Sequence, residues 1–336
     1  MTVTIKDIAK QAGVSFSTVS KALRNSPLVT EDTKKRILQI AGEMSYLPNY
    51  AARSLVSRKT YTIGVVWPSI ERVSHSVLLT NINATLEAQS YITLLSINQM
   101  GAAVNTFNRY IVDAILVFDD QKAVFDRSTI ESNVPILFYG IFGSTPYPTI
   151  DTNRKRAIDL AFEHLINLGH QRISYIGKLP TNDLFQEHKV SSFIVKSQEY
   201  NVPEREHMVI STDSMDPYDG YSAAKLLLSG NQSPTAIISG SYDLTRGILK
   251  AAKELAIDVP HALSIVSYDH IPQMAELDIP MTAVGVPISM IADTITQVLL
   301  DIADGKGVQL NTVLEPELIV RKSTHRAPVV HSSPSD

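Results

Sequence analysis

The sequence predicts an α/β protein in which a small three-helix head precedes a larger body of two Rossmann-like lobes. From Thr60 onward, short β-branched and apolar runs alternate with amphipathic stretches, the pattern of parallel sheets covered by helices on both faces. Eight or more candidate strands in about 260 residues favour two such sheets over one. Before Thr60, apolar residues recur at helical spacing instead, which predicts the helical head.

Charge is distributed unevenly between the head and the body. At 336 residues the chain is long enough for about two domains, and its net charge is −4. Residues 1–60 contain ten Lys or Arg and four Asp or Glu (+6), whereas the remainder contains 20 and 30 (−10). A basic head on an acidic body indicates that contacts with nucleic-acid phosphates, if any, are made by the head.

Other classes are disfavoured by what the sequence lacks. Without cysteine, neither disulfides nor thiolate chemistry is available. No basic start is followed by an apolar run, and no stretch approaches the ~18 apolar residues of a membrane span. We therefore expect a soluble cytoplasmic protein with no membrane partner.

Residues 5–25 predict two short helices joined by a tight turn. Apolar residues fall on one face of each helix, namely Ile5, Ile8 and Ala12, then Val19, Ala22 and Leu23. Gly13 lies where the chain must bend, a conformation that glycine adopts at little steric cost. Thr4 with Asp7 resembles a capping box, and Ser15 can cap the second helix.

The outward residues of this pair are mostly short, polar or basic: Ser15, Phe16, Ser17, Thr18, Ser20, Lys21 and Arg24. Such side chains contact phosphates and base edges in a major groove. The pair therefore predicts a DNA-binding helix-turn-helix, and Thr4 joins the predicted contacts at the start of the first helix. The alternative is an ordinary helical hairpin whose polar face is merely solvated.

A third helix and a short polar segment complete the head. Thr30 can cap the third helix, whose basic residues at 34–36 we expect on a solvated or phosphate-facing surface. Pro48 ends that helix, and Asn49 can cap about two further turns, too few for an isolated helix in water. Residues 46–60 are therefore either a plain linker or a segment that folds only when DNA and a partner chain are present.

Two runs in the head carry a family resemblance. IKDIAKQAGVSFSTVSKALRN (5–25) and YLPNYAARSL (46–55) resemble the lactose/galactose repressor (LacI/GalR) family of bacterial transcription regulators. The resemblance implies that the second helix enters the major groove and that residues 49–57 form a hinge helix against the minor groove. It implies that Leu55 wedges between base pairs at the centre of a near-palindromic operator, and we place Asn49, Ala52 and Arg53 among the hinge contacts. Arg24 departs from the family, which usually has asparagine there.

The body is read as alternating strands and helices. The predicted strands are Thr62–Trp67, Ile92–Ile97, Asp113–Phe118, Pro135–Tyr139, Arg172–Gly177, Met208–Ser211, Thr235–Ser239 and Leu263–Tyr268. The predicted helices include Arg154–Asn167, Lys189–Tyr200, Gly220–Leu228 and Leu244–Leu255. The stretch 98–110 is the weakest part of the family resemblance, because the family usually has a longer acidic helix there.

The body resembles the periplasmic-binding-protein-like core of the same family, in which two lobes clamp a small ligand and the chain crosses between them three times. Family-like phrases such as AFEHLINLGHQRISYIG (161–177) and VLEPELIVRKST (313–324) extend this resemblance along the chain. We predict a helix-turn-helix domain at 1–47, a hinge at 48–60, a two-lobed effector-binding and dimerisation domain at 61–325 and a disordered tail at 326–336. No leucine-heptad tail follows, so a homodimer is expected.

The predicted effector pocket lies at the carboxyl ends of the strands. The resemblance places Lys189 where the family has an arginine, Tyr242 where it has an asparagine, and keeps its aspartate as Asp269. Lysine cannot form arginine's planar fork, so the pocket should differ from that of simple-sugar repressors. A sugar is the default ligand, and sugar phosphate, nucleoside or no effector stay open. Trp67 is predicted either as an aromatic wall of the pocket or as core packing.

Nothing in the sequence assembles an enzyme site. His164 and His170 are not at the spacing of a helical metal pair, there is no phosphate loop, and Ser239-Gly240-Ser241 is not a nucleophile elbow. Asp119-Asp120 has no third ligand at motif spacing. We expect a repressor without cofactor or metal. The alternative is a cytoplasmic ligand-binding protein without DNA function, and the direction of the ligand response and a phosphoprotein partner stay open.

Overall fold

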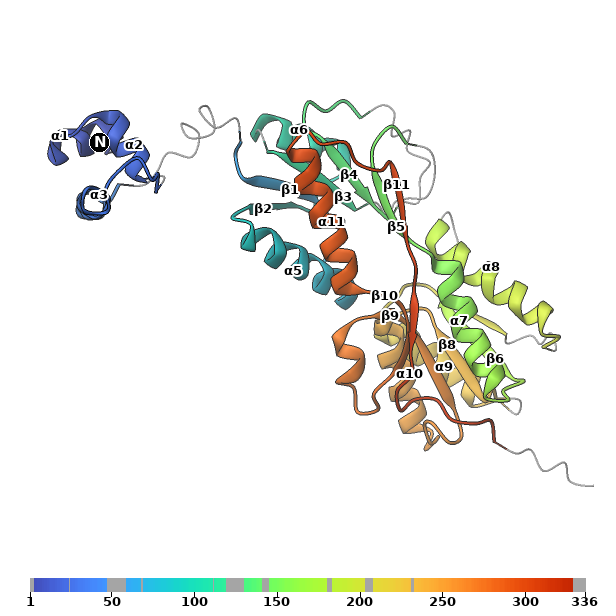
Figure 1. Ribbon diagram of the computed structural model, residues 1–336. Coiled ribbons are helices and arrows are strands. Elements are labelled where there is room, and N and C mark those ends of the chain that lie inside the picture. Colours follow the sequence, from blue (N-terminus) through green and yellow to red (C-terminus); the bar gives the residue numbers. More distant parts are fainter. Residues whose placement is uncertain are drawn as a thin grey trace, which may run out of the picture. The chain divides into compact units, whose positions relative to one another are not determined.

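The structure is a computed structural model that describes residues 3–23, 25–46, 59–67, 69–110, 112–118, 130–140, 145–179, 183–202, 208–230 and 233–328. The chain divides into two compact units, Met1–Thr60 and Tyr61–Asp336 (Figure 1). The predicted DNA contacts Arg24, Asn49, Ala52, Arg53 and Leu55 lie outside the described residues, as do the pair at 119–120 and residues 329–336 of the predicted tail.

Three helices form the first unit: α1 (Ile5–Ala12), α2 (Phe16–Leu23) and α3 (Glu31–Glu43). Each contributes to one apolar core, in which Ile8, Val19 and Ile37 are fully buried. The carboxylate of Asp7 accepts both the backbone N–H of Thr4 at 2.9 Å and its hydroxyl at 2.7 Å, which fixes the start of α1 as the sequence predicts.

Gly13 and Ser15 form the turn between α1 and α2. Gly13 has a φ of 63°, in the left-handed region that glycine adopts without steric cost. The hydroxyl of Ser15 accepts the backbone N–H of Thr18 at 3.1 Å and thereby caps α2. Both local predictions are confirmed, so the turn is specified by its own residues.

The predictions for α3 need correction. Thr30 stands at the N-cap, but its hydroxyl donates to a neighbouring side chain and caps no backbone N–H. Lys34 is buried and bonds Glu31 at 2.7 Å, and the Arg36 guanidinium donates to the carbonyl of Ala12 at 2.7 Å. Lys34 thus departs from the solvated or phosphate-facing surface that the sequence predicts for residues 34–36. Lys35 and Arg36 are exposed as predicted, and Arg36 in addition links α3 to the end of α1.

The first lobe is built on a parallel six-stranded sheet in the order β11-β5-β4-β3-β1-β2. Its strands are β1 (Thr62–Val66), β2 (Ile92–Ser96), β3 (Ala114–Phe118), β4 (Ile136–Tyr139), β5 (Thr149–Thr152) and β11 (Asn311–Leu314). The helices α5 (Val73–Ala88) and α11 (Ile288–Ala303) cover one face, and α6 (Met100–Tyr110) covers the other. Figure 1 shows α11 beside α5, although the two are far apart in the sequence.

The second lobe has a sheet in the order β12-β10-β9-β8-β6-β7, parallel except where β12 pairs with β10. Its strands are β6 (Ile173–Lys178), β7 (Val209–Thr212), β8 (Ala236–Ser239), β9 (Ser264–His270), β10 (Thr282–Pro287) and β12 (Glu317–Ile319). One face is covered by α9 (Pro217–Leu228) and α10 (Tyr242–Glu254), and the other by α7 (Arg154–Asn167) and α8 (Leu184–Glu199).

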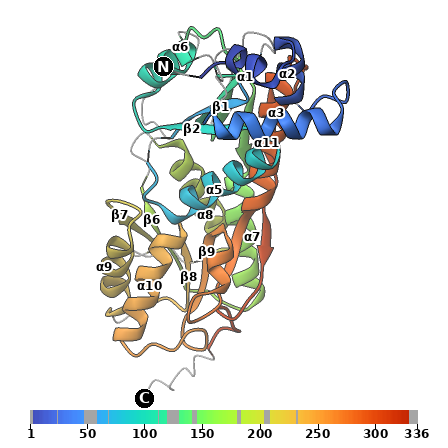
Figure 2. The same ribbon diagram turned by 90° about the vertical axis from the view of Figure 1, so that its left-hand side faces the viewer.

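The helices α9 and α10 approach each other unusually closely, side by side on the second lobe (Figure 2). Two glycines permit this approach. A methyl group added at Gly220 would collide with the backbone of Leu244, and one added at Gly247 would collide with the backbone of Pro217. No side chain fits at either position without separating the helices.

The chain crosses between the lobes three times, from β5 to α7, from β10 to α11 and from β11 to β12. This topology confirms the predicted fold class of a three-helix head and a two-lobed α/β core. The eight predicted strands are all present, with ends that differ by a residue or two. The strands β5, β10, β11 and β12 were not predicted, and the stretch 98–110 contains the helix α6.

Within the described residues, no helix is long and apolar enough to cross a membrane. In the same part of the chain, no three His, Asp or Glu side chains stand close enough together to hold a metal ion.

Candidate ligand pocket and nucleic-acid interface

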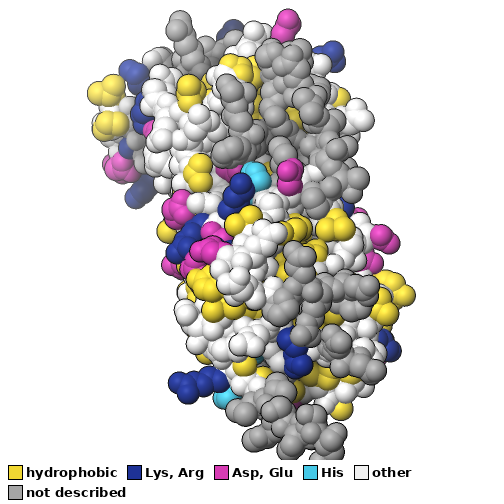
Figure 3. Space-filling view, turned by 90° about the vertical axis from the view of Figure 1, so that its right-hand side faces the viewer, with side chains coloured by type: hydrophobic (Ala, Val, Ile, Leu, Met, Phe, Trp, Pro, Cys, Tyr) yellow, Lys and Arg dark blue, Asp and Glu magenta, His cyan; other side chains and the backbone are white. Residues whose placement is uncertain are grey.

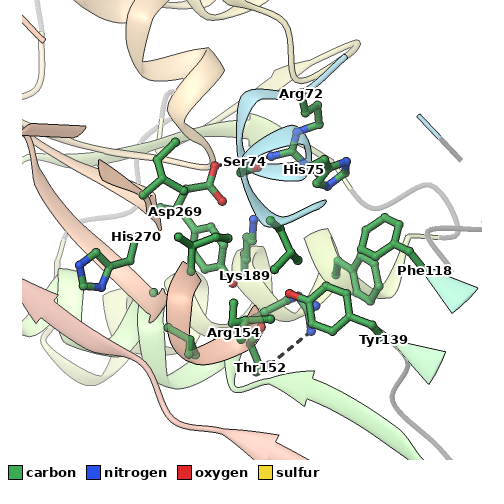
Figure 4. A pocket seen from close by; sticks show the side chains of 18 of the residues that line it. Arg72, Ser74, His75, Phe118, Tyr139, Thr152, Arg154, Lys189, Asp269 and His270 are labelled. Carbon is green, nitrogen blue, oxygen red and sulfur yellow. Dashed lines mark hydrogen bonds and ion pairs between the residues drawn. The ribbon is translucent and has the colours of Figure 1, made fainter. Parts of the chain in front are cut away.

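A cavity of about 90 Å³ lies where the two lobes meet (Figure 4). It is lined by the N-terminal turn of α5 and the strand ends of the first lobe, and by α8 and the end of β9 from the second lobe. Its described lining includes Arg72, His75, Phe118, Tyr139, Arg154, Lys189, Tyr268, Asp269, His270 and Val286. A cavity this small between two lobes admits a small ligand, or a larger one once the lobes separate.

Asp269 holds the end of β9 and links the two lobes. Its φ of 89° is uncommon for a residue with a side chain, and such backbone conformations persist where surrounding contacts fix them. One carboxylate oxygen accepts the backbone N–H of Tyr242 at 2.9 Å and lies 3.6 Å from the guanidinium of Arg72 in the other lobe. Asp269 therefore reaches the cavity, as predicted, while already engaged with both lobes.

Lys189 is a buried cation on α8, a helix whose N-cap Asp183 accepts the backbone N–H groups of its first turn. Its side-chain Nζ donates to the carbonyl of Gly240 at 3.0 Å and lies 3.6 Å from the centre of the Tyr268 ring. Burial lowers the pKa of Lys189 to about 7, although the nearby Asp269 acts in the opposite direction. The charged side chain is thus poorly compensated in this structure.

Arg154 is a pocket residue that the sequence reasoning did not identify. Its guanidinium bonds the buried carboxylate of Asp151 at 2.5 Å and lies 4.0 Å from the centre of the Phe185 ring. Burial is the largest single influence on the pKa of Arg154 and lowers it, but the charge of Asp151, together with nearby tyrosines, raises the pKa on balance. The sequence does contain one indication of this pair. The polar strand Thr149–Thr152 is followed at once by a helix that begins with basic residues.

Arg72 and His75 were also missed, because they lie at the N-terminus of α5, outside any motif. Burial, followed by repulsion from Arg72, lowers the pKa of His75 to about 3, so this ring is neutral at pH 7. His75 contacts the ring of Phe118 edge-on, with the ring centres 4.8 Å apart. Together these side chains form the first-lobe wall of the cavity.

Two predicted pocket residues do not project into the cavity. Trp67 is fully buried in the core of the first lobe and stacks on Phe118, with the ring centres 4.6 Å apart. It therefore supports the wall from behind. The side chain of Tyr242 lies in the core of the second lobe, and its contribution near the pocket is the backbone N–H that Asp269 accepts.

On the head, α2 presents the predicted DNA contacts on its outer side. Phe16 is 53% exposed, an unusual position for an aromatic ring, and Ser15 and Ser17 are exposed as well. Thr18, Ser20 and Lys21 are half-buried, and Thr4 is exposed at the start of α1. Apart from Thr4, the described members of the predicted set thus lie along α2 and the cap that precedes it.

A helix-turn-helix head followed by a two-lobed α/β body with a cavity between the lobes defines the class of DNA-binding transcriptional regulators that respond to small ligands. The comparisons with known proteins agree with this class. Residues 4–49 match the family described as bacterial regulatory proteins, lacI family, and residues 162–324 match the periplasmic binding protein-like domain.

The relatives support the family, and the solved structures support the fold. The chain is 30% identical to the probable HTH-type transcriptional repressor ExuR of Bacillus subtilis (strain 168), over 96% of this chain and 99% of that protein. It is 27% identical to catabolite control protein A of Priestia megaterium, over 85% and 90%. The fold matches the lac repressor dimer bound to operator and the anti-inducer ONPF, with a TM-score of 0.82 at 23% identity over 97% and 100%.

The chain belongs to the LacI family of bacterial regulatory proteins. It is a DNA-binding transcriptional regulator and not an enzyme, as the sequence predicts.

Proposed function

We propose that this protein represses transcription by binding a near-palindromic operator as a homodimer, under the control of a small ligand in the interlobe cavity. The observation that carries the proposal is the exposed outer side of α2, with Phe16 and Ser17 at its start, on a head of the LacI family. Residues at the N-terminal end of a recognition helix are those that reach base edges.

The head supplies two kinds of contact in this proposal. Phe16 and Ser17 read the bases, while the hydroxyls and the basic side chains position the helix on the phosphates: Thr4, Ser15, Thr18, Ser20, Lys21 and Arg24. Residues 1–47 form the DNA-binding domain and 48–60 the hinge. In the hinge, Asn49, Ala52 and Arg53 face the minor groove and Leu55 wedges between base pairs, which bends the DNA toward more protein surface.

The edge of the first lobe supports a homodimer. The outermost strand, β2, and the residue after it expose four large apolar side chains, Ile92, Leu94, Leu95 and Ile97. An exposed apolar sheet edge is a liability unless a partner covers it, and a second copy related by a two-fold axis would cover both edges at once. On the α8 side of the molecule, by contrast, hydrophobic side chains are interspersed with charged ones (Figure 3).

A sugar or sugar derivative is the proposed effector, with sugar phosphate, nucleoside or no effector as alternatives. Solved structures of the same fold include one with bound ribose and one in complex with cellobiose. Closing or opening the cavity moves one lobe against the other and so changes the separation of the two hinges in the dimer. A coupling of ~1–3 kcal/mol would change operator affinity about 5- to 150-fold.

In this proposal the protein acts in the cytoplasm, and on the nucleoid when it is bound to its operator. Gel-shift titration with a palindromic DNA fragment tests the proposal. The fragment should be selected from a random pool, and binding should weaken steeply with salt. Absence of salt-sensitive binding to any selected fragment would favour the alternative, a ligand-binding protein without DNA function.

Leu55→Ala tests the hinge. Losing the apolar wedge should weaken operator binding about 10-fold or more, because unstacking the central step no longer brings extra protein surface onto the DNA. Unchanged operator affinity in the gel shift would refute the wedge. Ser57→Ala, in the same segment, serves as the control.

A further inference from the structure

Four residues that line the cavity carry a buried polar atom with no hydrogen-bond partner among the described residues. These atoms are Nε of Arg72, Nδ1 of His75, Oε1 of Gln186 and Nδ1 of His270, the last of which lies 3.5 Å from the carboxylate of Glu317. Gln186 is only 4% exposed and lies one helical turn before Lys189 on α8. Buried polar groups in folded proteins are nearly always satisfied, so these atoms point to a polar ligand that bonds them.

The charges of the lining specify which polar ligand. Three cations reach the cavity, and two of them have a carboxylate within ion-pair distance: Arg154 pairs with Asp151, and Arg72 pairs with Asp269. Lys189 is 3% exposed and has no carboxylate within 4.0 Å among the residues that the structure describes. A buried cation without a counter-ion is costly, and an anion that enters the cavity relieves this cost.

We propose that the cavity binds a small anionic ligand, a polyol that bears a carboxylate or phosphate group, with its oxyanion held by Lys189 and Arg72. This inference rests on the proposed function only in taking the cavity as the effector site. The Arg72 end of the site lies at the N-terminus of α5, whose dipole also favours negative charge. The Gln186 amide and the His75 ring remain for hydroxyl groups of the same ligand.

The carboxylates around the cavity do not oppose this assignment, because each is already engaged. Asp269 accepts from Tyr242 and pairs with Arg72, Asp151 holds Arg154, and Asp183 caps α8. Asp243 accepts the N–H of Val73 at 3.3 Å, and burial raises its pKa. Asp269 lines the cavity itself, so the anion has to compete with this carboxylate for the guanidinium of Arg72, whereas Lys189 has no carboxylate to give up.

Anion binding at this place is linked to a proton. Burial is the largest influence on the pKa of Lys189 and lowers it, Arg72 and Arg154 lower it further, and Asp269 and Asp183 raise it by less. An adjacent anion raises the pKa of the lysine again, so binding near pH 8 takes up about one proton. Affinity should fall about tenfold between pH 6 and pH 8, as the free side chain loses its proton.

Calorimetric titration with matched ligands decides the matter. The probes are the neutral hexoses glucose and galactose, their C6 carboxylates and their 6-phosphates, together with acetate and inorganic phosphate, which have no sugar stereochemistry to satisfy. We expect binding confined to the anionic probes, with a heat at pH 8 that varies with the ionisation enthalpy of the buffer. Comparing the C6 carboxylates with the 6-phosphates shows which of the two anionic groups the cavity recognises.

Two variants of Lys189 separate charge recognition from packing. Lys189→Gln should weaken binding of the anionic probe about 10- to 100-fold and abolish proton uptake. Lys189→Arg keeps the charge and should retain binding without proton uptake, since arginine does not titrate in this range. Arg72→Gln provides an independent loss of binding if a lysine variant fails to fold.

Three results would overturn the proposal: a neutral hexose that binds within threefold of its acid, an anion bound equally by Lys189→Gln, or no heat with any probe, inorganic phosphate included. Operator binding by the ligand-free wild type is measured separately by gel shift. If no operator binding is found, the proposed repressor function is refuted, but the calorimetric result on anion binding remains valid.

Discussion

Replacing Lys189 with methionine should make the ligand-free protein more stable at neutral pH. The substitution keeps a long, flexible side chain and removes the buried charge on α8, so the space beside Tyr268 stays filled. It forfeits the hydrogen bond from Nζ to the carbonyl of Gly240. The gain in the free energy of unfolding is therefore the cost of burying the charge minus the cost of leaving one buried carbonyl without its donor.

The magnitude follows from the pKa of Lys189, which burial lowers from 10.5 to about 7. Between these values the unfolded chain binds a proton that the folded chain does not, so wild-type stability rises with pH across that window. At about 1.4 kcal/mol per pKa unit, the charge costs about 5 kcal/mol well below pH 7, about 4 kcal/mol at pH 7 and almost nothing above pH 10.5. Subtracting about 1–3 kcal/mol for the carbonyl leaves Lys189→Met about 1–3 kcal/mol more stable at pH 7.

Urea unfolding at pH 7, 8 and 9.5 measures this difference, which should shrink with rising pH and reverse between about pH 8 and pH 10. Lys196→Met, two turns further along α8, is the matched control. Its Nζ pairs with Glu163 at 3.2 Å and Glu199 at 2.9 Å, so its loss should change stability by no more than about 1 kcal/mol. A Lys189→Met protein that is less stable at pH 7, or a difference independent of pH, would refute the reasoning.

Three further predictions concern stability elsewhere in the chain. Gly247→Ala should cost about 3 kcal/mol in urea unfolding, because the added methyl group meets the backbone of α9, whereas Gly101→Ala, which meets open space, should cost nothing; equal effects would contradict the close approach of the helices. Arg154→Met should cost about 3–5 kcal/mol by stranding the buried Asp151, and adding Asp151→Asn should recover most of that loss; a double variant no better than the single one would contradict the pairing. Ser15→Ala should cost about 1 kcal/mol in the head, measured as faster amide exchange within α2, and unchanged exchange would argue against the cap.

The fold could be predicted where local patterns determine it. The apolar runs of β3 and β9 and the helix Arg154–Asn167 are recognisable because their side chains carry the period of the element. The short strand β5 reads as a polar loop, yet all four of its residues are buried. Its Asp151 is stabilised by Arg154, and only the folded structure supplies such a partner. The edge strands β11 and β12 are also hard to recognise, because they are only four and three residues long and their side chains are half-buried or exposed.

The pocket could be predicted only in part. Asp269 and Lys189 were reached by family resemblance, and both line the cavity. Arg72 and His75 lie on the opposite lobe, and nothing in their local sequence shows that the first turn of α5 faces the end of β9. That juxtaposition depends on the three crossings between the lobes. For Trp67 the local sequence allowed either position, and the stack with Phe118 places it in the core.

The first turn of α5 connects ligand recognition with the position of the lobes. Arg72 pairs with Asp269, and the N–H of Val73 bonds Asp243, so two carboxylates of the second lobe already hold this turn. An anion bound by Arg72 and Lys189 acts on the same contacts, since it competes with Asp269 for the guanidinium. The proposed ligand would therefore act on the same contacts that hold the two lobes together at α5. Only residues 61–72 separate this helix from the proposed hinge along the chain, so the proposal predicts that a ligand that moves this turn also changes operator affinity.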